Sequence, residues 1–162
     1  MCIDFSDLNK ACLKDEFPLP RIDALIDAQA RSEIMSLLDE YSGYHQIWLR
    51  KEDEPKTGFI TPFGTYCFVR MPEGLKNAWG TFSRMTTKIL GDQVGRNVLT
   101  YVDDIIVLSA KREDHIKDLS ETFANFRRAG LKLNPAKSIF IVEMGKFLGC
   151  FISAKGIEAN PA

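Results

Sequence analysis

The chain has 162 residues, of which 45% are hydrophobic and 27% are charged. This composition is typical of one globular domain, and it excludes a disordered tail and a small disulfide-stapled module. The 21 basic and 22 acidic side chains nearly cancel, so the net charge gives no sign of a nucleic-acid partner. Residues 1–60 carry 7 basic and 12 acidic side chains, and residues 61–162 carry 14 and 10. A polyanion is therefore expected to bind mainly to the second part.

The cysteines and the N-terminus bear on the compartment. The four cysteines form no CxxC pair and have no histidine at zinc spacing, which favours reduced structural thiols of an intracellular protein. No apolar run approaches the roughly 20 residues that a membrane helix needs, and the start of the chain lacks a signal-peptide pattern. The first five residues instead have the pattern of a strand whose upstream part is missing.

The first half of the chain predicts few long elements. A turn-rich segment over 7–20 precedes a short helix over 21–31. The apolar run over 33–38 predicts a buried strand that ends at Asp39, before a Ser42-Gly43 turn. Two β-rich runs, over 57–61 and 65–70, predict a hairpin.

The second half alternates helices and strands. The pattern predicts a helix over 76–90, strands over 97–102 and 105–108, a helix over 113–129 that ends at Gly130, and a hairpin of strands over 139–142 and 147–153. His115 is expected to be solvated, in the first turn of an exposed helix. This order of elements indicates an α+β fold, an antiparallel sheet with helices on one face.

Two adjacent carboxylates, Asp103 and Asp104, stand between apolar strands. Aspartate is a good turn residue, so a simple turn remains one interpretation. Like charges at the end of a buried hairpin repel each other, however, and a divalent cation such as Mg²⁺ would offset the repulsion. Asp39 also ends a buried strand and is the best third ligand, although a cap or turn role is an equal alternative.

Three carboxylates at adjacent strand ends suit phosphoryl transfer assisted by two metal ions. The backbone amides of residues 41–44, in the turn after Asp39, could face phosphate oxygens as a small anion nest.

At these residues the sequence resembles the reverse transcriptase domain of gypsy-class LTR retrotransposons, almost from end to end. The resemblance rests on many motifs in order and at fitting intervals, which makes it specific. The matching stretches are Asp4–Lys10, Phe17–Asp23, Leu38-Asp39, Ser42–Ile47, Lys56–Phe59, Thr61–Tyr66, Met71-Pro72, Gly74–Ala78, Tyr101–Asp104, Lys132–Pro135 with Lys137, and Phe147–Gly149.

The resemblance implies a role for each matching residue. Asp39, Asp103 and Asp104 would be the catalytic carboxylates and would hold two Mg²⁺ ions, or Mn²⁺ as a substitute. Residues implied to contact the incoming nucleotide are Ser42, Gly43, Tyr44 and Glu73, and Tyr44 would stack beneath the sugar and exclude a 2′-hydroxyl. Residues implied to position the primer and template are Tyr101, Phe147, Leu148 and Gly149. For the last three, a plain buried hairpin is nearly as good an interpretation.

The resemblance also implies a domain layout. One domain would cover residues 1–162, with fingers-like parts at about 1–38 and 45–75 and the palm at about 39–44 and 76–162. The thumb, connection and RNase H parts are expected to be absent. The implied partners are a primer–template, dNTPs and the rest of a polyprotein with protease, thumb, RNase H and integrase. No membrane partner is expected, and the implied location is the cytoplasm or a retrotransposon particle.

Three departures from the family pattern bear on activity. Glu73 stands where the family usually has Phe or Gln, Trp79 replaces a small residue, and Gly58 replaces Ala in an expected strand. The primary hypothesis is an RNA-directed DNA polymerase fragment, and the alternative is an inactive or domesticated remnant that folds without polymerising. A ferredoxin-like RNA-binding module is the weakest reading, because no basic-aromatic signature is present.

Overall fold

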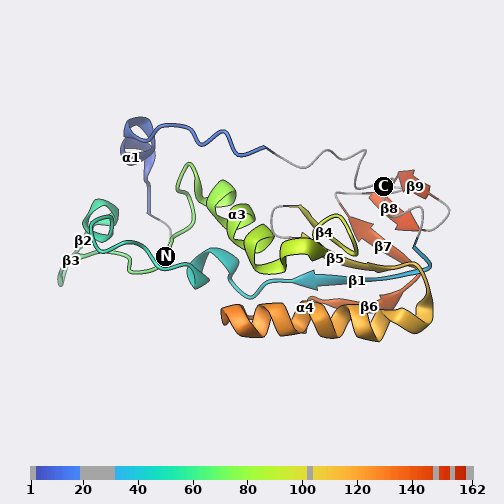
Figure 1. The fold of residues 1–162 in the computed structure, drawn as a ribbon. Helices are drawn as coiled ribbons and strands as arrows, with labels where there is room; N and C mark the ends of the chain where they lie inside the picture. The colour runs from blue at the N-terminus through green and yellow to red at the C-terminus, as the bar shows by residue number, and fades with distance from the viewer. Residues whose placement is uncertain (1–2, 19–31, 102–103, 148–149, 154–155, 160–162) are drawn as a thin grey trace. The chain divides into compact units, whose positions relative to one another are not determined.

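The computed structural model describes residues 3–18, 32–101, 104–147, 150–153 and 156–159. The chain divides into two compact units, the first formed by Met1–Phe17 and Ser42–Arg84 and the second by Pro18–Tyr41 and Met85–Ala162. The division falls inside helix α3 (Ala78–Leu90), which is drawn in light green in Figure 1.

The first unit contains short elements. They are α1 (Ser6–Ala11), the 3₁₀ turns η1 (Gly43–Gln46) and η2 (Glu54–Thr57), strands β2 (Phe59–Thr61) and β3 (Gly64–Tyr66), and the start of α3. Aromatic rings pack this unit: Phe68 lies 5.4 Å from Phe59 and 6.2 Å from the buried ring of Phe5, between ring centroids. Aromatic burial thus compensates for the small amount of regular structure here.

A four-stranded antiparallel sheet forms the centre of the second unit. Its strands are β4 (Val98–Tyr101), β5 (Asp104–Ser109), β1 (Ile34–Asp39) and β6 (Ile139–Val142), in that order. Three further strands, β7 (Met144–Phe147), β8 (Cys150–Ser153) and β9 (Gly156–Ala159), form a separate antiparallel sheet.

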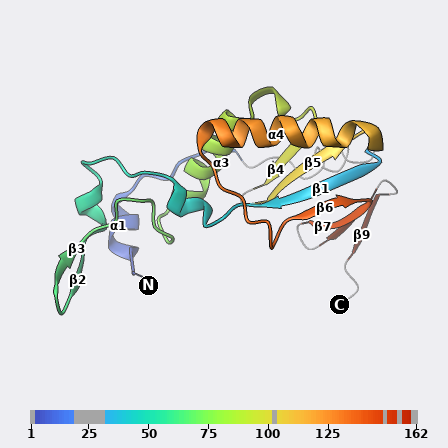
Figure 2. The ribbon, with the colours of Figure 1, turned by 90° about the horizontal axis from the view of Figure 1, so that it is seen from below.

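Helix α4 (His115–Ala129) covers one face of the four-stranded sheet, and β7 lies against the other (Figure 1, Figure 2). The helix follows the 3₁₀ turn η4 (Arg112–Asp114), and it ends where Gly130 adopts a left-handed conformation with φ 72°. Leu119 and Phe126 of α4 pack on Leu38, Ile105 and Val107 of the sheet. The same face receives Leu90, at the end of α3, before the 3₁₀ turn η3 (Gly91–Gln93).

The opposite face of the sheet holds a second apolar cluster. Met35, Leu99, Ile106 and Leu108 are buried there, and Leu37 and Tyr101 pack against them. Gly145 of β7 comes so close that a Cβ atom on it would lie 2.6 Å from a Leu37 methyl carbon. A side chain at residue 145 would therefore require the Leu37 side chain to shift where the two sheets meet.

The α+β prediction is confirmed, and most of the expected elements are present. The expected strand at 33–39, the hairpin at 57–70, the two long helices and the strands around Asp103-Asp104 correspond to β1, β2–β3, α3, α4 and β4–β5. No helix among the described residues is long and apolar enough to cross a membrane. The helix expected over 21–31 lies outside the described residues.

Five local expectations were wrong. The described residues of the first five form no strand, and the segment expected to be turns over 7–20 contains most of helix α1, just before which the Asp4 carboxylate accepts the N–H and hydroxyl of Ser6. Residues 139–142 pair with β1 rather than with 147–153, because β8 (Cys150–Ser153) pairs with β7 on one side and β9 on the other. Gly58 lies between η2 and β2, outside any strand. His115 is 1% exposed rather than solvated, because its ring lies against the sheet.

Candidate active site

Two of the three predicted carboxylates lie directly opposite each other. Asp39, the last residue of β1, is the register partner of Asp104, the first residue of β5. Asp104 is in turn the partner of Tyr101 at the end of β4. Side chains of directly opposed residues in antiparallel strands project from the same face, with Cβ atoms about 4.5–5.5 Å apart. The ends of three strands therefore bring Asp39, Asp104 and Tyr101 together.

These side chains belong to the face of the sheet opposite α4. Side chains alternate along a strand, so Asp39 shares its face with Leu37 and Met35, and Tyr101 shares its face with Leu99. Leu38 and Ile105, the neighbours of the two aspartates, project toward α4. Apolar packing on both faces thus fixes the ends of the two strands. Asp39 itself is half-buried, and Asp104 is exposed.

The backbone of Asp39 is held from both sides by the segment after α4. The N–H of Asp39 donates to the Ser138 hydroxyl at 3.1 Å, and its carbonyl accepts the N–H of Asn134 at 2.8 Å. The Ser138 hydroxyl donates onward to the Asn134 carbonyl at 2.8 Å. The family-like stretch around Asn134 therefore fixes the end of β1, a structural role that the sequence alone did not reveal.

The metal-binding capacity rests on carboxylate oxygens. Within the part of the chain that the structure describes, no ion pair or hydrogen bond reaches the Asp39 carboxylate. No group of three or more His, Cys, Asp or Glu side chains with metal-binding geometry occurs among the described residues, and Asp103 lies outside them. Two opposed carboxylates provide the hard oxygen donors that Mg²⁺ prefers, so the residues present fit such an ion.

The predicted nucleotide-binding residues belong to the first unit. Ser42 has the left-handed conformation, φ 49° and ψ 53°, and its carbonyl accepts the His45 N–H at 2.9 Å as η1 begins. This confirms the tight turn. The Tyr44 ring packs edge-on against the buried Phe82 ring of α3, 5.3 Å away. Glu73 is exposed in a turn with Gly74. The contribution of these residues to the site stays a prediction.

The predicted primer-positioning stretch is described only in part. Phe147 ends β7 and pairs with Cys150 at the start of β8. Leu148 and Gly149, like Val102 and Asp103, lie outside the described residues. Gly145 lies within an otherwise β-rich stretch, and a glycine in such a place is a sequence signal of the close approach to Leu37 that the fold reveals.

Solved structures share this fold. The foamy viral protease–reverse transcriptase in complex with an RNA/DNA hybrid matches 98% of this chain and 21% of its own length, with a TM-score of 0.87 and 22% identity. A foamy viral protease–reverse transcriptase in complex with double-stranded DNA matches 98% of this chain and 28% of its own, with a TM-score of 0.88 and 22% identity.

The sequence is also similar to retrotransposon polyproteins. It is 40% identical over 161 residues to the retrovirus-related Pol polyprotein from transposon opus of Drosophila melanogaster, and 33% identical over 161 residues to that from transposon gypsy. These matches cover 99% of this chain and 16% of each polyprotein. The Tf2-3 polyprotein of Schizosaccharomyces pombe is 35% identical over 96% of this chain and 12% of its own length. The chain thus spans less than a fifth of these relatives.

Residues 1–152 match the family described as reverse transcriptase (RNA-dependent DNA polymerase). This match covers both described carboxylates and the strands that carry them. Together with the aspartates at the strand ends, it shows that the chain belongs to the reverse transcriptase family, as the motifs predicted.

Proposed function

We propose that this chain forms the palm and part of the fingers of an RNA-directed DNA polymerase. It would add dNTPs to the 3′-hydroxyl of a primer on an RNA or DNA template. The observation that carries the proposal is the placement of Asp39 opposite Asp104 at the ends of β1 and β5, in a chain of this family. The palm would include strand β1 and residues 39–44 and 76–162, since β1 belongs to the four-stranded sheet, and the fingers would lie in the residues before β1 and in 45–75.

Two divalent cations, when bound, would activate the primer hydroxyl and neutralise the triphosphate. Asp39 and Asp103 would be the direct ligands, with Asp104 beside them. The Asp39 carboxylate is suited to this role, since no described side chain competes for its oxygens and its backbone is fixed by Asn134 and Ser138. A ligand that is held in place before the metal arrives loses little conformational freedom on binding.

The remaining roles follow the family pattern. The Tyr44 ring, braced by Phe82, would lie beneath the incoming sugar and exclude a 2′-hydroxyl. The turn amides around Ser42 and Gly43 would bind phosphate oxygens, which a left-handed residue followed by a 3₁₀ turn allows. Tyr101 and residues 147–149 would position the primer end. The partners would be a primer–template, dNTPs and the rest of an intracellular polyprotein.

Glu73 favours a second candidate, a folded remnant without polymerase activity. A carboxylate about 4 Å from a phosphate charge costs about 1 kcal/mol in water and about 4 kcal/mol at an effective dielectric constant of about 20. Glu73 is exposed, and Trp79 lies in the first turn of α3. The intact aspartates favour polymerase activity, whereas Glu73 and Trp79 oppose it. An incorporation assay distinguishes the two candidates.

The experiment measures incorporation of labelled dTTP on poly(rA)–oligo(dT) with Mg²⁺ or Mn²⁺. We expect Asp39→Asn and Asp103→Asn to lower incorporation at least about a hundredfold, since a lost metal ligand removes several kcal/mol of transition-state stabilisation. Asp92→Asn, at an exposed aspartate of η3, is the matched control and should retain activity. Glu73→Phe should raise incorporation if Glu73 repels the nucleotide.

Two results would contradict the polymerase proposal. One is incorporation that survives both Asp39→Asn and Asp103→Asn. The other is no incorporation by any of these proteins while circular dichroism shows them folded, which would support the remnant.

A further inference from the structure

A buried histidine joins two strands of the sheet. His115, the first residue of α4, is 1% exposed, and its two ring nitrogens contact hydroxyl groups from neighbouring strands. Nε2 lies 2.7 Å from the Ser36 hydroxyl of β1, and Nδ1 lies 2.8 Å from the Ser109 hydroxyl of β5. Ser36 and Ser109 are 0% and 2% exposed, so these bonds form out of contact with water.

The two ends of this hydrogen-bonded chain determine its direction. At one end the backbone N–H of Ile141 in β6, which can only donate, bonds the Ser36 hydroxyl oxygen at 3.1 Å. At the other end the Ser109 hydroxyl donates to a carboxylate oxygen of Asp118, 2.5 Å away, which as an anion only accepts. The single hydrogen of the Ser109 hydroxyl is therefore directed to Asp118, so Ser109 accepts from Nδ1, and Nδ1 carries a proton. Ser36 uses one lone pair for the Ile141 N–H and donates its own hydrogen to Nε2 when the ring is neutral. The neutral imidazole that fits these bonds is the Nδ1–H tautomer.

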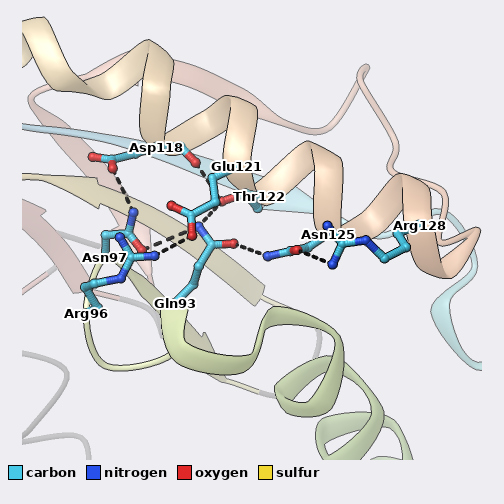
Figure 3. A network of polar contacts seen from close by, with 8 residues as sticks. All are labelled: Gln93, Arg96, Asn97, Asp118, Glu121, Thr122, Asn125 and Arg128. Carbon is cyan, nitrogen blue, oxygen red and sulfur yellow. Dashed lines mark hydrogen bonds and ion pairs between the residues drawn. The ribbon is translucent and has the colours of Figure 1, made fainter.

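Asp118 is itself fixed by a second polar network. Asn97, just before β4, donates to the other Asp118 carboxylate oxygen at 2.8 Å. Gln93 of η3 donates to the Thr122 hydroxyl at 3.1 Å and accepts from Asn125 at 2.7 Å, so η3 is tied to α4 beside it (Figure 3). Asp118 is therefore held as the acceptor end of the chain of bonds.

Asp118 is the charged group that acts on the imidazole. Burial lowers the pKa of His115, and the negative charge of Asp118 opposes this in part. Ser36 of β1, Ser109 of β5 and the Ile141 N–H of β6 bring no charge to the ring. In η4, the guanidinium of Arg112 is paired with Glu143. Burial thus favours the neutral ring, and the hydrogen bonds place its proton on Nδ1.

Apolar packing of β1 on β5 leaves one alternative register to be excluded. Apart from Ser36, residues 34–38 and 105–108 are apolar on both faces of the sheet. A slip of one residue would exchange the faces, but a slip of two would keep every apolar residue on its own face. Such a slip would move Asp104 away from Asp39. A buried polar contact that fits one register can exclude the others, as buried Asn does in coiled coils.

We propose that His115 is a positioning residue, whose neutral Nδ1–H imidazole clamps Ser36 of β1 to Ser109 of β5 and so holds the register that sets Asp39 opposite Asp104. The clamp contacts neither aspartate. It acts from the helix-covered face of the sheet, while the carboxylates project from the other. The consequence for metal binding rests on the proposed function, and the clamp itself does not.

The first test is NMR of the ¹⁵N-labelled chain, in which long-range ¹H–¹⁵N couplings report which ring nitrogen carries the proton. The chain has two histidines, and His45→Asn identifies the signals of His115. We expect a single Nδ1–H tautomer for His115 between pH 7 and 8. An Nε2–H tautomer, or a charged ring in that range, would overturn the proposal.

The second test separates positioning from simple stabilisation. Ser36→Ala and His115→Phe break the clamp, and Ser120→Ala is the matched control, because that exposed hydroxyl bonds only within α4. Under conditions where each protein is folded, we expect the Mn²⁺ Kd to rise about threefold to tenfold in the clamp variants, as the loss of one net hydrogen bond implies, and to stay unchanged in Ser120→Ala. A lowered unfolding midpoint with an unchanged Mn²⁺ Kd would overturn the positioning role.

The two proposals fail in different ways. If the unchanged chain binds no Mn²⁺, the proposed function fails, and the register is read instead from NOEs between backbone protons of β1 and β5. Those NOEs should weaken in Ser36→Ala and persist in Ser120→Ala. Equal NOEs in both variants would overturn the clamp.

Discussion

Asp39 is positioned by contacts from several separate parts of the chain. Its side chain stands at a strand end opposite Asp104, and its N–H and carbonyl are both bonded by the segment at 134–138. Like charges directly opposite each other in a sheet destabilise it. The sequence could predict the carboxylate from its motif, but not the contacts from Asn134 and Ser138, because these join positions about a hundred residues apart.

Stability should depend on pH through His115. Burial lowers its pKa in the folded chain, whereas the unfolded chain keeps the ordinary value of about 6.5. As pH falls below about 6.5 the unfolded chain takes up the proton first, so the stability that the neutral ring contributes is present above that pH and is lost toward acid. Urea unfolding between pH 5 and 8 should show this decline.

The pH prediction has a matched control. His45→Asn removes the exposed histidine of η1 and should keep the decline, whereas His115→Phe should make it shallower. An equal decline in His115→Phe would assign the effect to the carboxylates instead.

Elements show how local patterns and long-range pairing differ. Helix α4 ends at Gly130 as expected, and its buried residues recur every three or four positions. Strand β6 has an equally clear β pattern, yet its partner is β1 rather than the next strand along the chain. Periodicity specifies the type of an element, while the choice of partner depends on which edge of a sheet is available.

Gly145 provides a test at this scale. A Cβ atom there would lie 2.6 Å from a Leu37 methyl carbon and 3.3 Å from the Met35 sulfur. We therefore expect Gly145→Ala to lower the free energy of unfolding by about 1–3 kcal/mol, as overpacking does. Urea denaturation measures the change.

Leu37→Val removes part of the overlap. In a double-mutant cycle, Gly145→Ala should cost less in the Leu37→Val background than in the unchanged chain. Additive effects would show that Leu37 is not the residue displaced.

At the scale of the whole molecule, the two compact units differ from the two halves of the sequence. The first unit carries 8 basic and 8 acidic side chains, and the second carries 13 and 14, counted over the ranges of each unit. The surplus of basic side chains in residues 61–162 is thus balanced by acidic residues from 18–41, which belong to the same unit. Neither unit has the positive charge that tight nucleic-acid binding normally needs.

The chain by itself should therefore bind a primer–template with a shallow salt dependence. The logarithm of the binding constant falls by about 0.9 for each phosphate contact per unit of log salt concentration. We expect the plot of log binding constant against log salt concentration to have a slope that corresponds to about two or three phosphate contacts. Fluorescence anisotropy at neutral pH, over about 20 to 200 mM salt, measures it. A slope of about −6 or steeper would instead indicate a concentrated basic surface.

The family, the α+β class and the placement of Asp39 and Asp104 at strand ends could be inferred from the order of the amino acids, because each depends on short motifs and local periodicity. The burial of His115 between two serines, the pairing of β6 with β1 and the approach of Gly145 to Leu37 emerge only when the elements pack together. These features arise from contacts between residues far apart in the chain. Such contacts depend on how whole elements pack, and hydrophobic periodicity does not encode the choice among packings that bury the same residues.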